Sequence, residues 1–209
     1  MTMVWLHWEK KRDIEAAAML LEQGKVIAGS SDTVLGLLAL ACQQGYFALN
    51  SIKQRGDKPY LIMLDQGAAV AEYVQYPLNN WVAQVMQHFW PGPLTIVLPA
   101  RHGLPAWMQG SDGTIALRVP DHDGLRSLIR SVGPLFSTSA NVTGHAIPHS
   151  IHDIDPIIVQ KIAACIDDQQ APLTLPSTII DARGDEPMII REGMIPAMDI
   201  LSLLGRGRE

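Results

Sequence analysis

The sequence has few cysteines and no long apolar run, and each scarcity excludes a class of protein. Its 209 residues include two cysteines, Cys42 and Cys165, which lie far apart and suggest neither a disulfide framework nor a CxxC metal site. Apolar runs such as Leu94–Pro99 are far shorter than the roughly 20 residues of a membrane helix. The N-terminus lacks the order of basic, apolar and small residues that marks a signal peptide. We therefore expect a cytoplasmic protein with reduced thiols and no membrane segment.

The most easily recognised catalytic motifs are missing as well. The chain has no GxxxxGK[ST] loop and no GxGxxG after a strand, so the two commonest nucleotide cradles are absent. It also has no HExxH and no GxSxG. His145, His149 and His152 lie close together in sequence, but no cysteine or helical frame accompanies them, and we expect no metal site there.

The sequence has fewer basic than acidic residues. The formal net charge is −5, from 16 Lys and Arg against 21 Asp and Glu. A chain this acidic has no general electrostatic reason to coat nucleic acid. An anionic ligand must instead be held by a local cluster of basic side chains.

Apolar residues, at 47% of the chain, are sufficient for a continuous core, and the length fits a single domain over residues 1–209. Short β-branched or large apolar runs bounded by Gly, Pro or Asp predict strands at 25–29, 60–64, 94–99, 114–119, 134–138, 177–181 and 188–191. Helices are predicted at 12–23, 68–74, 78–88, 124–130, 157–166 and 197–204. Several strand pairs are joined by segments too short for a crossover helix. These features predict an α/β (α+β) fold with one mixed parallel and antiparallel sheet flanked by helices.

Two polar segments follow predicted core elements. Residues 30–36 place three hydroxyls and a carboxylate directly after a strand, where they either cap a following helix or bind a ligand. Lys53, Arg55 and Lys58 place three cations on a turn at a helix end. Such a run is either a solvated helix terminus, favoured by the helix dipole, or a clamp for a polyphosphate.

Two further segments carry polar groups at strand positions. Arg118 interrupts an apolar strand and shares a face with Thr114 and Ala116, so it needs a structural carboxylate or a bound anion as partner. Residues 137–144 combine hydroxyl and amide side chains where a strand runs into a turn. That segment is either a plain turn or an anion- or nucleotide-binding surface. Smaller polar elements lie at 176–178 and 190–193.

Taken together, these segments resemble the YrdC-like family of threonylcarbamoyl-adenylate synthases over about residues 12 to 193. Each motif alone is weakly specific, whereas six in the family's order and near its spacing are strongly specific. The six are Ser31-Asp32-Thr33-Val34-Leu35-Gly36-Leu37, Lys53-Gln54-Arg55, Pro91-Gly92-Pro93-Leu94-Thr95, Ala116-Leu117-Arg118-Val119-Pro120, Ser137-Thr138-Ser139-Ala140-Asn141 and Pro176-Ser177-Thr178.

The resemblance implies a fold and an activity. The fold is a single twisted mixed sheet with a large concave cavity lined by positive charge. The activity is that of a nucleotidyltransferase which forms threonylcarbamoyl-adenylate and pyrophosphate from L-threonine, bicarbonate and ATP, with Mg²⁺ accompanying ATP. Partner enzymes then transfer the threonylcarbamoyl group to an adenosine beside the anticodon of certain tRNAs, and tRNA is a further expected partner.

The resemblance also implies site residues. The threonine-binding positions are Thr33, Arg118 and Ser177, with Arg118 facing the substrate carboxylate. The ATP-binding positions are Lys53, Arg55, Lys58, Thr114, Ser139, Asn141 and Arg191. No side chain is implied as an acid, base or nucleophile. The chain differs from many members at Gly29-Ser30-Ser31, where they have Tyr-Pro-Thr, and at Leu35, where they have an aromatic residue.

A different class of function is also compatible with this scaffold. The alternative is a non-catalytic or regulatory YrdC/YciO-like protein that binds tRNA or double-stranded RNA through the cavity. Binding that falls steeply with salt and does not depend on ATP would favour it.

Overall fold

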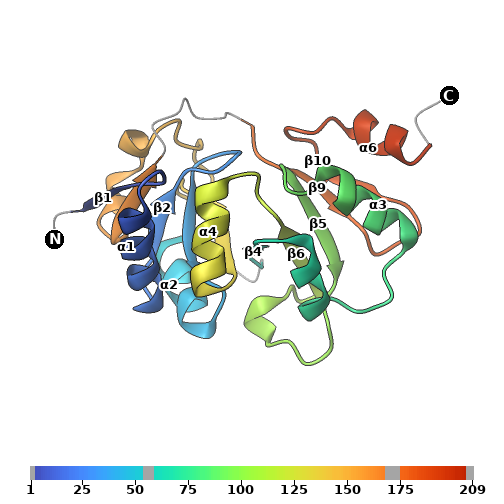
Figure 1. Ribbon diagram of the computed structural model, residues 1–209, viewed down its shortest axis with the longest axis horizontal. Coiled ribbons are helices and arrows are strands. Elements are labelled where there is room, and N and C mark those ends of the chain that lie inside the picture. Colours follow the sequence, from blue (N-terminus) through green and yellow to red (C-terminus); the bar gives the residue numbers. More distant parts are fainter. Residues whose placement is uncertain (1–2, 54–58, 168–174, 206–209) are drawn as a thin grey trace.

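The computed structural model describes residues 3–53, 59–167 and 175–205, in which helices are interspersed among the strands (Figure 1). The strands are β1 (Val4–His7), β2 (Ile27–Gly29), β3 (Gly36–Leu40), β4 (Leu61–Met63), β5 (Leu94–Pro99), β6 (Thr114–Arg118), β7 (Leu135–Ser139), β8 (Ala164–Asp167), β9 (Thr178–Asp181) and β10 (Met188–Arg191). The α-helices are α1 (Lys11–Glu22), α2 (Gln43–Lys53), α3 (Asn80–Phe89), α4 (Asp123–Val132), α5 (Pro156–Val159) and α6 (Ala197–Leu203). Short 3₁₀ helices are η1 (Gly67–Glu72), η2 (Ala106–Met108) and η3 (Ile151–Asp153).

The strands form one ten-stranded sheet in the order β1-β8-β2-β3-β7-β4-β6-β5-β9-β10. β8 runs parallel to both β1 and β2, whereas β3 is antiparallel to β2 and to β7. The prediction of a single mixed sheet flanked by helices is confirmed. Within the described ranges no helix is both long enough and apolar enough to cross a bilayer.

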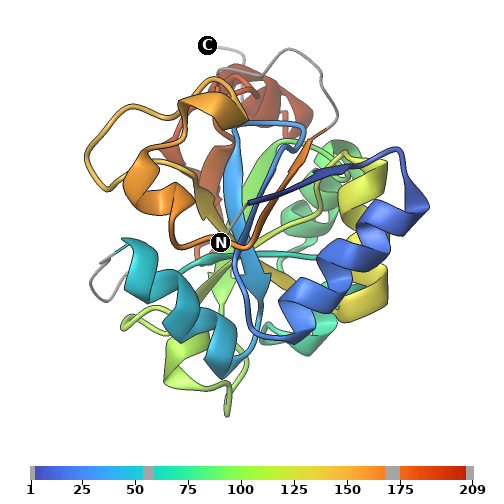
Figure 2. The ribbon, with the colours of Figure 1, turned by 90° about the vertical axis from the view of Figure 1, so that its left-hand side faces the viewer.

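Two apolar layers pack on opposite faces of the sheet. Leu38 of β3 packs in the layer that contains Leu21 of α1 and Leu128 of α4, whereas its neighbour Leu37 packs in the layer that contains Leu49 of α2. This is the alternation expected of a strand buried on both faces. Figure 2 shows the same division, with α1 and α4 on one side of the strands and α2 on the other.

Helix α1 illustrates how local sequence sets an element. Asp13, Ala17 and Leu21 are buried at intervals of four residues, so one stripe of the helix faces the sheet. Gly24 follows with a φ of 74°, in the left-handed region that favours glycine after a helix. The predicted helix at 12–23 is therefore confirmed to within one residue at each end.

Other predictions of secondary structure were wrong. The pattern predicts a helix over 157–166, but the structure has the single turn α5 and then strand β8. β8 is inserted between two parallel partners, and a strand buried on both faces shows no alternation that would distinguish it from a buried helix. The pattern also predicts no strand at β1 or β3, and the helix expected at 68–74 is the 3₁₀ helix η1.

An arginine links the start of β6 to the end of β9. The Nη1 of Arg183 lies 3.1 Å from Oδ2 of Asp112, and its Nε lies 3.0 Å from each carboxylate oxygen of Asp181. The hydrogen bond from Arg183 lowers the pKa of Asp181 below its usual value. The hydrogen bond from the Thr114 hydroxyl likewise lowers the pKa of Asp112.

Helix α1 provides a matched test of the packing. We expect Leu21→Ala to lower the free energy of unfolding by about 2–5 kcal/mol, because Leu21 is fully buried beneath the helix. Met19→Ala on the same helix removes a side chain that is 60% exposed, and its expected effect is within about 0.5 kcal/mol. Urea unfolding measures both values, and equal losses would contradict the packing described for α1.

The contacts of Arg183 predict how the stability of the protein depends on pH. A carboxyl group with a lowered folded-state pKa stabilises the protein above its unfolded-state pKa of about 3.9, and this contribution is lost as the pH falls through the folded value. Asp181→Asn should therefore be less stable than wild type at pH 7, and the difference should shrink below about pH 4. Urea unfolding between pH 3 and pH 7 measures the difference, and a gap that does not change with pH would contradict the assignment.

Candidate functional site

The apolar layer beneath α1 and α4 covers only part of its face of the sheet. Its strand residues come from β1, β8, β2, β3 and β7, with Met63 of β4 as the last, and none of those described comes from β5, β6 or β9. Beyond Met63 the same face carries polar side chains. Arg118 lies beside Met63 in the β4–β6 register, and Thr114 shares its face by strand alternation. The other face remains apolar across β5 and β6.

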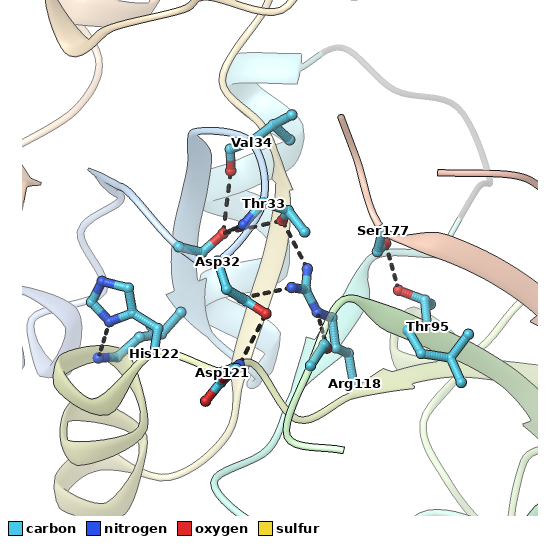
Figure 3. A network of polar contacts seen from close by, with 12 residues as sticks. Asp32, Thr33, Val34, Thr95, Arg118, Asp121, His122 and Ser177 are labelled. Atoms are coloured by element: carbon cyan, nitrogen blue, oxygen red, sulfur yellow. Dashed lines mark hydrogen bonds and ion pairs between the residues drawn. The ribbon is translucent and has the colours of Figure 1, made fainter. Parts of the chain in front are cut away.

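Arg118 is the centre of the polar region and is only 1% exposed (Figure 3). Its Nε donates to the backbone oxygen of Gly92 at 3.0 Å, and its Nη1 donates to Oγ1 of Thr33 at 2.9 Å. Its Nη2 forms an ion pair with Oδ1 of Asp32 at 2.6 Å. Burial lowers the pKa of Arg118, and the charge of Asp32 opposes that shift. The buried cation is thus held by one carboxylate, one hydroxyl and one carbonyl.

The ion pair between Arg118 and Asp32 is close and buried. Nη2 of Arg118 and Oδ1 of Asp32 lie 2.6 Å apart, and each is the charged partner of the other. The other oxygen of Asp32 is held by the backbone N–H of Asp121 at 3.0 Å. The two oxygens of Asp32 are thus both engaged, and the side chain has a fixed position beside Arg118.

The loop between β2 and β3 supplies Asp32 and Thr33. Oγ of Ser31 accepts a hydrogen bond from the backbone N–H of Thr33 at 3.2 Å, which orders the loop locally. The chain then enters strand β3, so the interpretation of residues 30–36 as a helix cap was wrong. Of these hydroxyls, that of Thr33 accepts from Arg118, whereas that of Ser30 accepts from Nε1 of Trp8. The loop thus positions Asp32 and Thr33 for the site.

A second group of predicted residues joins Ser177 to Arg191. The Nη2 of Arg191 donates to the backbone oxygen of Ser177 at 2.7 Å, and Oγ of Ser177 lies 2.8 Å from Oγ1 of Thr95. Burial lowers the pKa of Arg191, and the positive charge of Arg118 lowers it further. A nearby anion would relieve this repulsion between the two cations.

A third group lies where β7 ends. Lys53, at the C-terminus of α2, is 6% exposed, and its Nζ donates to the backbone oxygen of Ser139 at 2.8 Å and to Oδ1 of Asn141 at 3.2 Å. Oγ of Ser139 donates to the same Oδ1 at 2.6 Å. The predicted residues of this group are thus brought into direct contact although 86 positions separate Lys53 from Ser139.

The remaining predicted residues stand apart. The hydroxyl of Thr114 donates to Oδ1 of Asp112 at 2.7 Å, and Thr114 lies four positions from Arg118 along β6, a span of about 13 Å. Arg55 and Lys58 lie outside the described residues.

The sequence prediction missed three contributors to the site. They are the carboxylate of Asp32, the hydroxyl of Thr95 and the backbone oxygen of Gly92. All three lie inside the six motifs, and Thr95 is a buried hydroxyl in an otherwise apolar strand, which is the signal that would have marked it. The carbonyl of Gly92 carries no signal in the side-chain pattern.

Comparison with known proteins agrees with the six motifs. The model of the Sua5/YciO/YrdC family, described as telomere recombination, matches residues 19–193. The threonylcarbamoyl-AMP synthase of Pseudoalteromonas translucida is 34% identical over 178 residues, covering 81% of this chain and 92% of that protein. The threonylcarbamoyl-AMP synthase of Pyrococcus abyssi is 30% identical over 203 residues, covering 93% of this chain.

The structural comparison extends over nearly all of the chain. A crystal structure of P. abyssi Sua5 complexed with L-threonine superposes with a TM-score of 0.89 at 27% identity and covers 99% of this chain. The chain spans 62% of that structure and 58% of the P. abyssi synthase, so it corresponds to part of the longer protein. Because the family model covers most of the sequence and the P. translucida protein matches over most of both chains, this chain belongs to the Sua5/YciO/YrdC family.

Proposed function

We propose that the chain is a threonylcarbamoyl-AMP synthase, a nucleotidyltransferase that forms threonylcarbamoyl-adenylate and pyrophosphate from L-threonine, bicarbonate and ATP. The observation that carries the proposal is the buried Arg118, held by Asp32 and Thr33 on the face of the sheet where the apolar layer of α1 and α4 ends. A buried guanidinium with donors to spare is suited to bind a small carboxylate. The names of the relatives and the threonine-bound neighbour support the same substrate.

The threonine end of the proposed site is built around Arg118. A guanidinium has five N–H donors, of which two in Arg118 are used by Gly92 and Thr33, and its Nη2 is paired with Asp32. In the proposal, the substrate carboxylate binds Arg118, while Thr33 and Ser177 contact the rest of the amino acid. Thr95 holds the Ser177 hydroxyl in place.

The nucleotide end of the proposed site uses the other cationic groups. Lys53, Ser139 and Asn141 form one connected cluster at the end of β7, and Arg191 lies beside Ser177. We assign these residues, with Thr114, Arg55 and Lys58, to ATP. Lys53 and Arg191 would balance the negative charge that develops on the phosphates.

The chemistry requires little of the protein beyond positioning and charge. The amine of threonine combines with bicarbonate to give a carbamate and water, and a carbamate oxygen then attacks the α-phosphorus and displaces pyrophosphate. The attacking oxygen is already anionic, so no side chain has to remove a proton from it. Holding the carbamate and the α-phosphate in contact supplies much of the rate enhancement.

Magnesium is proposed to enter with ATP. Among the residues that the structure describes, no group of three or more His, Cys, Asp or Glu is arranged to hold a metal ion. Magnesium in phosphoryl-transfer sites is held largely by the phosphates of the substrate. The metal is therefore treated as part of the Mg–ATP substrate.

The proposed product serves the modification of tRNA to threonylcarbamoyladenosine. We propose that the chain acts in the cytoplasm, where partner enzymes transfer the threonylcarbamoyl group to tRNA, and that tRNA itself is a transient partner. No specific observation favours the alternative of a non-catalytic RNA-binding or regulatory protein, and the net charge of −5 opposes general binding to RNA.

The wild-type protein tests the proposal directly. With ATP, Mg²⁺ and bicarbonate present, L-threonine is expected to raise pyrophosphate release at least about tenfold above the rate without it. Release is followed by a coupled phosphate assay, and the adenylate is identified by mass spectrometry. Intact ATP binding with no threonine-dependent release would contradict the synthase proposal and favour the regulatory alternative.

Arg118 is the most informative position to change. We expect Arg118→Ala to reduce threonine-dependent pyrophosphate release by about 100-fold or more, because it removes the group that binds the carboxylate. Arg101→Ala, which removes an exposed arginine, is the matched control and should retain wild-type activity. Circular dichroism establishes that both variants are folded, and a folded Arg118→Ala with near-normal activity would exclude the proposed role.

A further inference from the structure

The indole of Trp8 lies between the two elements that meet at Asp32. Trp8 follows β1 and is 4% exposed, and its backbone N–H donates to the oxygen of Asp167 at the end of β8 at 3.1 Å. Its Nε1 donates to Oγ of Ser30 at 2.9 Å, and its ring meets that of His122 edge to face, with the ring centroids 5.0 Å apart. Ser30 begins the β2–β3 loop, and His122 caps α4. One buried side chain thus contacts both elements.

Two glycines make room for this indole. A Cβ atom on Gly29, the last residue of β2, would lie 3.1 Å from Cζ2 of Trp8. A Cβ atom on Gly124, in the first turn of α4, would lie 3.0 Å from both Cβ and Cε3 of Trp8. Protein interiors are packed too closely to accept an added methyl group at such distances without a shift of the neighbouring atoms. The end of the strand and the start of the helix are therefore both packed directly against Trp8.

The contacts of Trp8 lead by two routes to the carboxylate that pairs with Arg118. Along the β2–β3 loop, Ser30 is two residues before Asp32. Directly before the cap of α4, Asp121 donates its backbone N–H to Oδ2 of Asp32 at 3.0 Å, and Oδ1 of Asp32 lies 2.6 Å from Nη2 of Arg118 (Figure 3). The loop and the start of the helix must keep a fixed separation for the Asp121 hydrogen bond to form, and Trp8 is in contact with both.

We propose that Trp8 is a positioning residue for the threonine end of the site, because it sets the distance between the β2–β3 loop and the start of α4. This inference rests on the proposed function and deepens it. With that distance fixed, Asp32 and Thr33 hold the guanidinium of Arg118 in one orientation, in which it binds the substrate carboxylate. The indole is buried and acts only through these contacts.

A role in packing alone explains less of the arrangement. An apolar ring would fill the same space, whereas the indole N–H of Trp8 is paired with a hydroxyl of the loop that carries Asp32. Trp81 of α3 offers a comparison within the same protein, because it is 8% exposed and its Nε1 has no hydrogen-bond partner among the described residues. A buried tryptophan is thus accommodated in this protein by packing, and the hydrogen bond from Trp8 to Ser30 is an additional feature that ties the ring to the loop.

The hydrogen bond between Trp8 and Ser30 can be removed from either side. Trp8→Phe keeps an aromatic ring and removes the N–H, whereas Ser30→Ala removes the acceptor. We expect either variant to raise the dissociation constant of L-threonine about three- to tenfold, the factor that corresponds to one net hydrogen bond. The dissociation constant of ATP should stay within about twofold of wild type, because Lys53 and Asn141 belong to a separate cluster. Isothermal titration calorimetry measures both constants.

Two further readouts separate positioning from a general loss of stability. The double variant with Trp8→Phe and Ser30→Ala should raise the dissociation constant of threonine no further than the larger single change, because both substitutions remove the same hydrogen bond. The hydrogen-exchange rate of the Asp121 amide, followed by NMR, should rise in each variant, because its bond to Asp32 opens more often.

The matched control is Trp81→Phe, which makes the same exchange of rings in α3 without removing a hydrogen bond to a described residue. It should leave the dissociation constant of threonine and the exchange of the Asp121 amide unchanged. Circular dichroism establishes that the variants are folded, and Ser30→Ala alone is sufficient for the test if Trp8→Phe does not fold.

The outcomes separate this inference from the proposed function. If wild type binds threonine and releases pyrophosphate but neither variant weakens threonine binding, Trp8 only fills space and the inference is overturned. Equal losses of affinity for threonine and ATP, or effects that add in the double variant, would overturn it as well. A wild type that binds no threonine and releases no pyrophosphate would refute the proposed function, and the role of Trp8 at the threonine end would fail with it.

Discussion

The structure depends on the burial of one charge, that of Arg118 at the end of β6. A guanidinium that is 1% exposed is tolerated only where its donors meet acceptors and its charge meets an anion. Those partners come from two distant parts of the chain, the β2–β3 loop with Asp32 and Thr33 and the turn before β5 with Gly92. The amide of Asp121, three positions after Arg118, fixes Asp32. The arginine therefore ties together the two halves of the sheet.

The two faces of the sheet differ in how far their apolar layers extend, and Arg118 lies where one of these layers ends. One face is apolar across the sheet, while the opposite face is apolar only as far as Met63 and then becomes polar. Helix α4 packs on the apolar part of this face. At the start of the helix, Nδ1 of His122 accepts the N–H of Leu125 at 3.1 Å. The residue before it, Asp121, is the one that holds Asp32. The cap of a packing helix and the geometry of the site are thus set by adjacent residues.

The separation of the site into clusters matches the demands of the proposed reaction. Arg118 and Asp32 form a nearly neutral pair beside Thr33, whereas Lys53 brings a cation to the end of β7 beside Ser139 and Asn141. Arg191 donates to the backbone oxygen of Ser177, and the charge of Arg118 lowers its pKa. Binding both substrates is then a matter of local charge, which an acidic chain can provide.

The sequence by itself determined the family, the mixed sheet and most of the polar positions, because residues such as Arg118 and Ser139 break the apolar pattern of strands that are otherwise buried. It did not determine strand β8 or the partners of the site. β8 is a short apolar run whose state depends on its neighbours β1 and β2, and no local pattern separates such a strand from a buried helix. The pairing of Asp32 with Arg118 joins residues 86 positions apart, and the carbonyl of Gly92 belongs to the backbone. Only the tertiary structure decided these contacts, because hydrogen bonds and ion pairs depend on distance in space and leave no periodic trace along the chain.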